Sequence, residues 1–179
     1  KDRVTKALNQ VYEEISRATK IKGFRPGKAP RHVIEAEHGA LAREETIKKI
    51  IVEALSSVSY AKGVSNHQGS RATEDPRIME AVFRELKKRR LYYLDSFVSR
   101  NSTCIDLAHK MHLPIARRDI FLDNLEDPVY IKLQINKLKI KARMHGEAIG
   151  IGHDRKNTLK VISEVMPQLE KDGYSFLVL

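Results

Sequence analysis

The sequence predicts an α/β protein preceded by a helical segment. Residues 4–18 place apolar side chains three and four positions apart, which is the spacing of an amphipathic helix. After residue 55, short apolar runs alternate with longer helical stretches, a rhythm typical of a parallel sheet whose strands are joined by helices. A chain of 179 residues has room for one such domain and at most one small extra module. We therefore expect an all-helical part over residues 1–55 and an α/β domain over residues 56–179.

The first part is expected to consist of helices joined by one exposed loop. The first amphipathic stripe ends near Lys20, and the next ten residues, 21–30, contain two Gly, two Pro and three cations. This composition disfavours regular structure and predicts a loop. Pro30 suits the start of a second helix, and Gly39 is expected to end it. A further apolar stripe at 47–55 predicts a third helix.

The second part is expected to hold five strands with helices between them. Two Asp-Pro pairs, at 75–76 and 127–128, have the pattern of an N-cap followed by proline in the first turn of a helix. Gly146 and Gly173 stand where helices are expected to end. The expected strands are 61–65, 91–94, 120–122, 148–151 and 174–179. The two helices that open at the Asp-Pro pairs are expected to run to about residues 90 and 144, and two further helices are expected at 102–111 and 158–169.

Polar residues follow the predicted strands at the ends where parallel sheets bind ligands. In strand order they include His67, Asp95, Asp123 and His153. Two histidines and two aspartates on one rim are the side chains of a metal-assisted hydrolytic site. Any one of them alone is more often a structural cap or a hydrogen-bonded loop residue. The four together, at successive strand ends, favour the functional interpretation.

Composition and charge limit the other classes of function. There are 33 Lys and Arg against 23 Asp and Glu, so the formal net charge of +10 suits anionic partners. The single cysteine, Cys104, excludes an internal disulfide, and no apolar run approaches the length of a membrane span. The sequence contains no Gly-rich phosphate loop, so we expect no nucleotide cofactor. The first residues lack the apolar stretch of a secretory signal, which favours a cytoplasmic protein.

Four separated stretches occur in an order typical of one family. They are Gly63-Val64-Ser65-Asn66-His67-Gln68-Gly69-Ser70-Arg71, residues 86–96, residues 118–124, and Ala148-Ile149-Gly150-Ile151-Gly152-His153. Through these stretches, residues 54–179 resemble the divergent polysaccharide deacetylases, relatives of the deformed-barrel carbohydrate deacetylases. Gln68 stands where the family usually has Met, and Asp154 where it usually has Pro. The resemblance implies the C-terminal part of a deformed (β/α) barrel-like parallel sheet.

The same resemblance implies a hydrolase that removes acetyl groups from a carbohydrate polymer. A divalent metal, with zinc the favoured ion, would activate water and polarise the acetyl carbonyl. The resemblance implies His67 as a metal ligand, and His153 as a second ligand or as the acid that protonates the leaving group. It implies Asp95 as an orienting or basic carboxylate. The substrate rim would be formed by Asn66, Ser70 and Arg71.

One part of the family pattern is absent. The family's N-terminal strand ends in an Asp-Asp pair near the metal, and residues 1–55 contain no adjacent pair of aspartates. A metal site that lacks a carboxylate binds its metal more weakly, and the general base is lost with it. We therefore expect the deacetylase function to be impaired. Asp119 and Asp123 are expected to anchor loops.

The loop in the first part carries a different resemblance. It contains Gly23-Phe24-Arg25-Pro26-Gly27-Lys28-Ala29-Pro30, and with it residues 4–55 are similar to the ribosome-binding domain of trigger factor. The resemblance implies docking beside the ribosomal exit tunnel through Gly23, Phe24, Arg25 and Lys28. In that contact the cations would meet phosphates or acidic side chains while the ring enters a pocket.

Two partial families joined near Leu55 indicate some form of chimera. We expect the N-terminal helices to pack over the sheet that the missing elements leave bare. Three functions stay open: a deacetylase-like hydrolase, a ribosome-associated module, and an inert chimera. The compartment is open too, because deacetylases of this kind act outside the cytoplasm.

Overall fold

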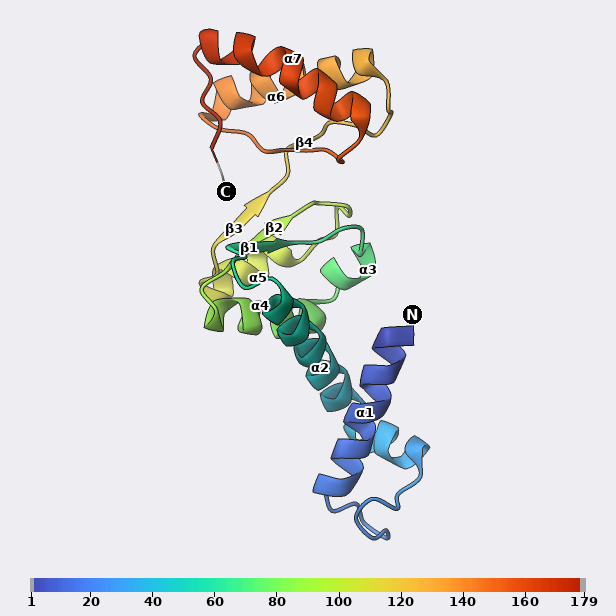
Figure 1. Cartoon of the computed structure of the whole chain (residues 1–179). Coiled ribbons are helices and arrows are strands. Elements are labelled where there is room, and N and C mark those ends of the chain that lie inside the picture. The colour runs from blue at the N-terminus through green and yellow to red at the C-terminus, as the bar shows by residue number, and fades with distance from the viewer. Residues whose placement is uncertain (1, 178–179) are drawn as a thin grey trace.

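The computed structural model describes residues 2–177 as an elongated chain of three units (Figure 1). A helical hairpin stands at one end, a three-stranded parallel sheet with its helices in the middle, and a smaller sheet with two helices at the other end. In chain order the elements are α1 (Asp2–Ala18), α2 (Arg31–Ser57), β1 (Gly63–Ser65), α3 (Ser70–Thr73), α4 (Pro76–Lys88), β2 (Tyr92–Asp95), α5 (Cys104–Met111), β3 (Ile115–Arg117), β4 (Ile120–Phe121), α6 (Pro128–His145), β5 (Gly150–Ile151) and α7 (Lys156–Lys171).

The hairpin of α1 and α2 has its own apolar core, which includes Val11, Tyr12 and Ile34. The prediction that Gly39 ends a helix is wrong, because α2 continues through it to Ser57 and includes the helix expected at 47–55. Gly39 is buried, and a Cβ atom there would lie 3.6 Å from the hydroxyl of Tyr12. Glycine inside a helix costs about 1 kcal/mol relative to alanine. At 3.6 Å the added Cβ atom would be in ordinary van der Waals contact, so packing against Tyr12 does not require the glycine.

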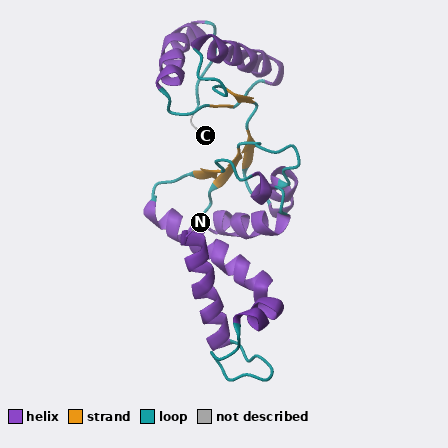
Figure 2. Cartoon of the chain, turned by 90° about the vertical axis from the view of Figure 1, so that its right-hand side faces the viewer, coloured by secondary structure: helices purple, strands orange, loops and turns teal. Residues whose placement is uncertain are grey.

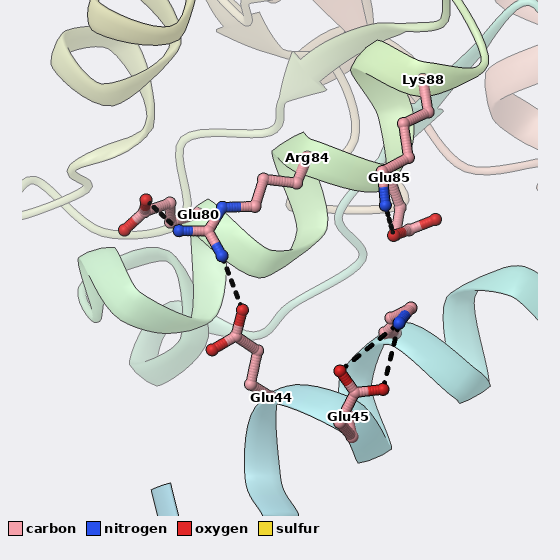
Figure 3. Close-up of polar contacts among 7 residues, drawn as sticks. Glu44, Glu45, Glu80, Arg84, Glu85 and Lys88 are labelled. Atoms are coloured by element: carbon pink, nitrogen blue, oxygen red, sulfur yellow. Dashed lines mark hydrogen bonds and ion pairs between the residues drawn. The ribbon is translucent and has the colours of Figure 1, made fainter. Parts of the chain in front are cut away.

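The hairpin attaches to the rest of the chain through α4. Figure 3 shows the contact: Arg84 of α4 binds Glu44 of α2 at 2.7 Å and Glu80 of its own helix at 2.6 Å. Glu85, which is buried, pairs with Lys88 at 2.7 Å. The expectation that the N-terminal helices cover the sheet is therefore wrong, because α2 packs on the helix that already covers it.

The middle unit is a parallel sheet in the order β1-β2-β3, with Val64 opposite Tyr93 and Tyr93 opposite Ile115. The parallel arrangement agrees with the sequence-based expectation. Strand β3 was not expected, because residues 115–117 lack an extended apolar run. The core between this sheet and α4 and α5 contains Phe83, Leu86, Tyr93, Cys104 and Leu113.

The last unit is built on the parallel pair β4-β5, in which Ile120 lies opposite Gly150. Helices α6 and α7 supply its core together with Leu122. Within the described residues the strands form two short parallel sheets, and the barrel-like arrangement that the resemblance implied stays a prediction. The strand expected at 174–179 is not formed over residues 174–177, and residues 178 and 179 lie outside the described part. Tyr174 instead directs its hydroxyl towards the carbonyl oxygen of Lys139.

The helix boundaries follow local signals that the sequence makes visible. Asp75 and Asp127 cap α4 and α6 by accepting hydrogen bonds from backbone N–H groups, with proline next in each helix. Gly146 follows α6 at a φ of +85° and Gly173 follows α7 at +88°, values that favour glycine. None of the helices between residues 2 and 177 is long and apolar enough to cross a membrane.

Candidate functional site

A pocket of about 320 Å³ lies at the carboxyl ends of strands from both sheets. This is the edge at which parallel sheets bind ligands. Residues following β1, β2, β4 and β5 all contribute to it. The lining consists of Asn66, His67, Gln68, Ser96, Val98, Phe121, Asp123, Asn124, Ile151, Gly152, His153 and Arg155.

Asn66 fixes the loop that carries His67. Its side-chain oxygen accepts a hydrogen bond from the backbone N–H of Ser96 at 2.9 Å, and its amide group donates to the carbonyl oxygen of Gln68 at 3.0 Å. Gln68 and Gly69 both have positive φ, so the chain turns sharply after His67. The histidine therefore stands exposed at the pocket rim on a loop tied to the neighbouring strand end.

His153 is held by Asp123. Oδ1 of Asp123 lies 2.9 Å from Nδ1 of His153, and Oδ2 accepts hydrogen bonds from the backbone N–H of His153 and the hydroxyl of Thr158, each at 2.8 Å. Asp123 is fully buried, whereas one third of the His153 side chain is exposed. The imidazole consequently has one nitrogen bound to the carboxylate and the other free to meet a ligand.

The environment of Asp123 keeps it ionised. Burial raises the pKa of this carboxyl group, but the hydrogen bonds from His153 and Thr158 outweigh that effect and lower the pKa below its ordinary value. An ionised Asp123 accepts the Nδ1–H of His153, which directs the lone pair of the neutral ring to Nε2. The sequence pattern placed Asp123 on the rim, but the resemblance gave it only the role of a loop anchor.

The two site histidines face each other, one from each sheet. The ring centroids of His67 and His153 are 5.9 Å apart and their planes are nearly perpendicular. The ring of Phe121 lies 5.4 Å from that of His153 on another side. No group of three His, Cys, Asp or Glu that could hold a metal ion is found among the described residues. The donors at this position are two imidazoles, one fewer than the three protein ligands of catalytic zinc sites.

Asp95 does not line the pocket, although the next residue, Ser96, does. It is fully buried, and its carboxylate oxygens accept hydrogen bonds from the backbone N–H of Phe97 at 2.8 Å and the hydroxyl of Ser102 at 2.7 Å. These contacts hold the turn that follows β2, and they occupy both oxygens. The role of Asp95 as an orienting or basic carboxylate stays a prediction.

The pocket includes some of the expected rim and some residues that were not expected. Asn66 lines it, whereas Ser70 and Arg71 belong to α3 and are not among the described lining residues. Arg155 is an addition: it donates a hydrogen bond from Nη1 to the carbonyl oxygen of Asp123 at 3.0 Å. In the sequence, the only feature that indicates a site role for Arg155 is its position two residues after His153.

The loop between α1 and α2 stands at the far end of the molecule from the pocket (Figures 1 and 2). Residues 22–28 are all exposed, among them Phe24, Arg25 and Lys28. Gly23 and Gly27 have φ values of +85° and +75°, and the N–H of Gly27 donates to the carbonyl oxygen of Ser16 at 2.7 Å. The four residues expected to contact a ribosome are thus presented together, but not near the histidines.

Comparison with known families shows to which family the larger part of the chain is related. Residues 34–179, which include the whole pocket, match the family described as divergent polysaccharide deacetylase. The chain belongs to the divergent polysaccharide deacetylase family. The match begins earlier than residue 54, within α2, so it includes the segment that joins the hairpin to β1.

The relatives of this deacetylase-family chain include the uncharacterized protein YibQ of Escherichia coli K12. It is 32% identical over 128 residues, which are 72% of this chain and 40% of YibQ. Among solved structures, the uncharacterized protein ATU2773 from Agrobacterium tumefaciens C58 is similar with a TM-score of 0.61 and 27% identity. That likeness covers 62% of this chain and 45% of the other. The chain thus spans less than half the length of these relatives.

The trigger factor resemblance has a narrower basis. Trigger factor from Anaeromyxobacter dehalogenans 2CP-C is 44% identical over 55 residues, which are 31% of this chain and 13% of that protein. A match of this length suggests common ancestry for one segment and gives only weak support to a fusion of two families.

Proposed function

We propose that the pocket is a hydrolytic site that removes acetyl groups from a carbohydrate polymer, with His153 as its acid–base group. The observation that carries the proposal is the contact between the buried carboxylate of Asp123 and the partly exposed ring of His153 at the pocket wall. A histidine oriented by a buried carboxylate is a common proton-transfer unit in hydrolytic enzymes. Family membership supplies the substrate class.

Each residue of the pair has a separate task in the proposed chemistry. Asp123 accepts a hydrogen bond from the Nδ1–H of His153, fixes the ring, and stabilises the imidazolium form when Nε2 gains a proton. Nε2 then takes a proton from the attacking water or returns one to the departing amine or alcohol. Such a positioned acid–base group contributes about 10²–10⁴-fold to a rate.

The remaining lining provides for substrate binding. Asn66, Gln68 and Asn124 carry amide groups, and Arg155 adds a cation beside them. These donors suit the hydroxyl and carbonyl oxygens of an acetylated sugar. His67 faces His153 across the opening and is the second group we assign to the reacting centre.

Metal dependence is part of what the resemblance implies. His67 and His153 would be the ligands of a divalent metal, but they are one ligand short of a catalytic zinc site. The proposed proton transfers therefore contain no step through a metal.

The test is acetate release from N-acetylated chito-oligosaccharides and from O-acetylated xylan. We expect release by the wild-type chain, a loss of about 10²-fold or more in His153→Ala, and no change in His145→Ala, an exposed histidine at the end of α6. Absence of acetate release from both substrates, or equal loss in the two variants, would contradict the proposal.

A second function is favoured by the position of the basic loop. Phe24 is exposed between two positive-φ glycines at the tip of the hairpin, where a large partner can reach it without meeting the pocket units. Docking to the ribosome predicts salt-sensitive co-sedimentation that Phe24→Ala with Arg25→Ala abolishes. Val4→Ala with Arg3→Ala, on the same hairpin, is the control. If all variants behave as wild type in this assay and in acetate release, the inert chimera is the correct interpretation.

A further inference from the structure

Helix α6 has two apolar faces, of which only one is packed. Ile131, Ile135 and Leu138 contribute to the core of the last unit. On the other side, Val129, Leu133, Ile140 and Met144 are 66%, 54%, 58% and 71% exposed. We call these four residues the outer stripe. A helix that is apolar on both sides is typical of one enclosed between two layers, and here the second layer is missing from the described residues.

The outer stripe has the dimensions of a helix-packing seam. Its members follow one another at intervals of 4, 7 and 4 residues. At about 100° per residue they fall within an arc of about 60°, and at 1.5 Å per residue they extend over about 22 Å. Asn136 is also exposed and lies in the seven-residue interval between Leu133 and Ile140. With it, the residues on this face are three or four positions apart, which is the spacing found in coiled coils.

Cations border the outer stripe on both sides. Lys132 and Arg143 lie along one margin of the helix and Lys137 and Lys141 along the other, and α6 contains no Asp or Glu. Salt bridges join Lys132 to Glu164 and Lys141 to Asp119. Among the described residues, no carboxylate lies within ion-pair distance of Lys137 or Arg143. The face therefore combines an apolar centre with two cations, Lys137 on one margin and Arg143 on the other, that form no ion pair within the described residues; Arg143 lies over the ring of Tyr174.

These features favour one kind of binding partner over the others that could cover an apolar helix face. A second copy of the chain, packed face to face through α6, would bring lysines and arginines together, which is unfavourable. A bilayer is bound best by a wide apolar face carrying aromatic residues, whereas the outer stripe is narrow and holds neither Phe nor Trp. An amphipathic helix with acidic flanks matches both the seam and its margins.

We propose that the outer stripe of α6 is the docking site for an acidic amphipathic helix of a partner protein. In this complex, apolar side chains of the partner pack between Leu133 and Ile140, and its carboxylates meet Lys137 and Arg143. Helices α6 and α7 form the end of the molecule opposite α1 (Figure 1), so the partner helix and the hairpin loop engage at opposite ends.

The proposal is tested with two designed helical peptides that share a leucine seam. One has glutamates beside the seam and the other has lysines at the same positions, and binding to the whole chain is measured by fluorescence anisotropy. We expect the glutamate peptide to bind and the lysine peptide not to. The double variant Leu133→Ser/Ile140→Ser should weaken binding by about tenfold or more. Leu159→Ser is the matched control, because Leu159 is an apolar residue of α7 with similar exposure, 56%.

A charge reversal and two alternative occupants complete the test. Lys137→Glu/Arg143→Glu should transfer the preference to the lysine peptide, with the circular dichroism spectrum unchanged. The proposal is overturned by equal binding of both peptides, by binding of neither, or by an equal effect of Leu159→Ser. It is also overturned if the chain forms a dimer in sedimentation and Leu133→Ser/Ile140→Ser abolishes that dimer. The same holds if the chain binds phosphatidylglycerol vesicles more tightly than it binds the glutamate peptide and the double variant abolishes the vesicle binding.

Discussion

Asp123 holds both the ring and the backbone of His153. One carboxylate oxygen lies 2.9 Å from Nδ1 of the ring, and the other accepts the N–H of the same residue at 2.8 Å. The hydroxyl of Thr158, at the start of α7, binds this second oxygen as well. A single buried carboxylate therefore fixes the side chain that we assign to proton transfer and joins the end of β5 to the helix that follows.

The first prediction concerns the charge of this carboxylate. Asp123→Asn keeps the shape but replaces an acceptor with a group that no longer stabilises the imidazolium, so we expect acetate release to fall by about 10²–10⁴-fold. Thr158→Val removes one hydrogen bond to Asp123 without touching the ring contact and should cost much less. Rates measured across pH distinguish the roles, because a purely structural Asp123 would leave the pH profile of the residual activity unchanged.

A second prediction follows from the lowered pKa of Asp123. The folded state binds this proton less tightly than the unfolded state, so the contribution to stability is present above the unfolded pKa. It is lost as the pH falls through the lower folded pKa. We expect the free energy of unfolding, measured with urea, to decrease below about pH 4. Asp123→Asn should be less stable at pH 7 and should lose less stability on acidification; parallel curves for the two proteins would contradict the assignment.

The fold was predictable where a local signal decides the structure. Asp75 and Asp127 predict the starts of α4 and α6, and Gly146 predicts the end of α6. Gly39 misled because tertiary packing outweighs its low helix propensity: Ile34 and Ala42, on either side of it, are buried in the core of the hairpin, and α2 continues through it. Strand β3 was missed because three residues paired with β2 carry too little pattern to be recognised.

The site was predictable as a set of strand ends but not as a set of contacts. The pattern placed His67, Asp123 and His153 on one rim, and all three line the pocket. Which carboxylate serves His153 depends on how the end of β4 lies against the end of β5, a relationship absent from the sequence. The resemblance implied Asp95 as an orienting or basic carboxylate, a role that stays a prediction; in the structure its oxygens bind the turn after β2.

The third prediction tests the two histidines as metal ligands. With two imidazoles as donors, zinc affinity in an isothermal titration should be lower than in sites with three protein ligands. Removing either imidazole, in His67→Ala or His153→Ala, should weaken binding further by about tenfold. His145→Ala should have no effect. Equal affinity in all four proteins would show that zinc binds elsewhere and that the ring pair is not a metal site.

The fourth prediction concerns the packing of β1 at the edge of its sheet. Gly63 lies opposite Tyr92, and a Cβ atom at Gly63 would be 2.4 Å from atoms of the tyrosine ring. The ring covers the glycine, so Gly63→Ala forces Tyr92 out of its place and should destabilise the chain by about 1–3 kcal/mol.

A variant at Tyr92 tests whether the clash with its ring causes this loss of stability. Tyr92→Leu removes the ring and some packing, so it should destabilise the chain on its own. In the double variant the alanine meets no ring, and its cost, measured by urea unfolding, should largely disappear. Additive losses in the double variant would show that the cost of alanine arises from the backbone of β1 rather than from Tyr92. The position of the pocket loop, which begins at Asn66 directly after β1, would then depend on the geometry of the strand alone.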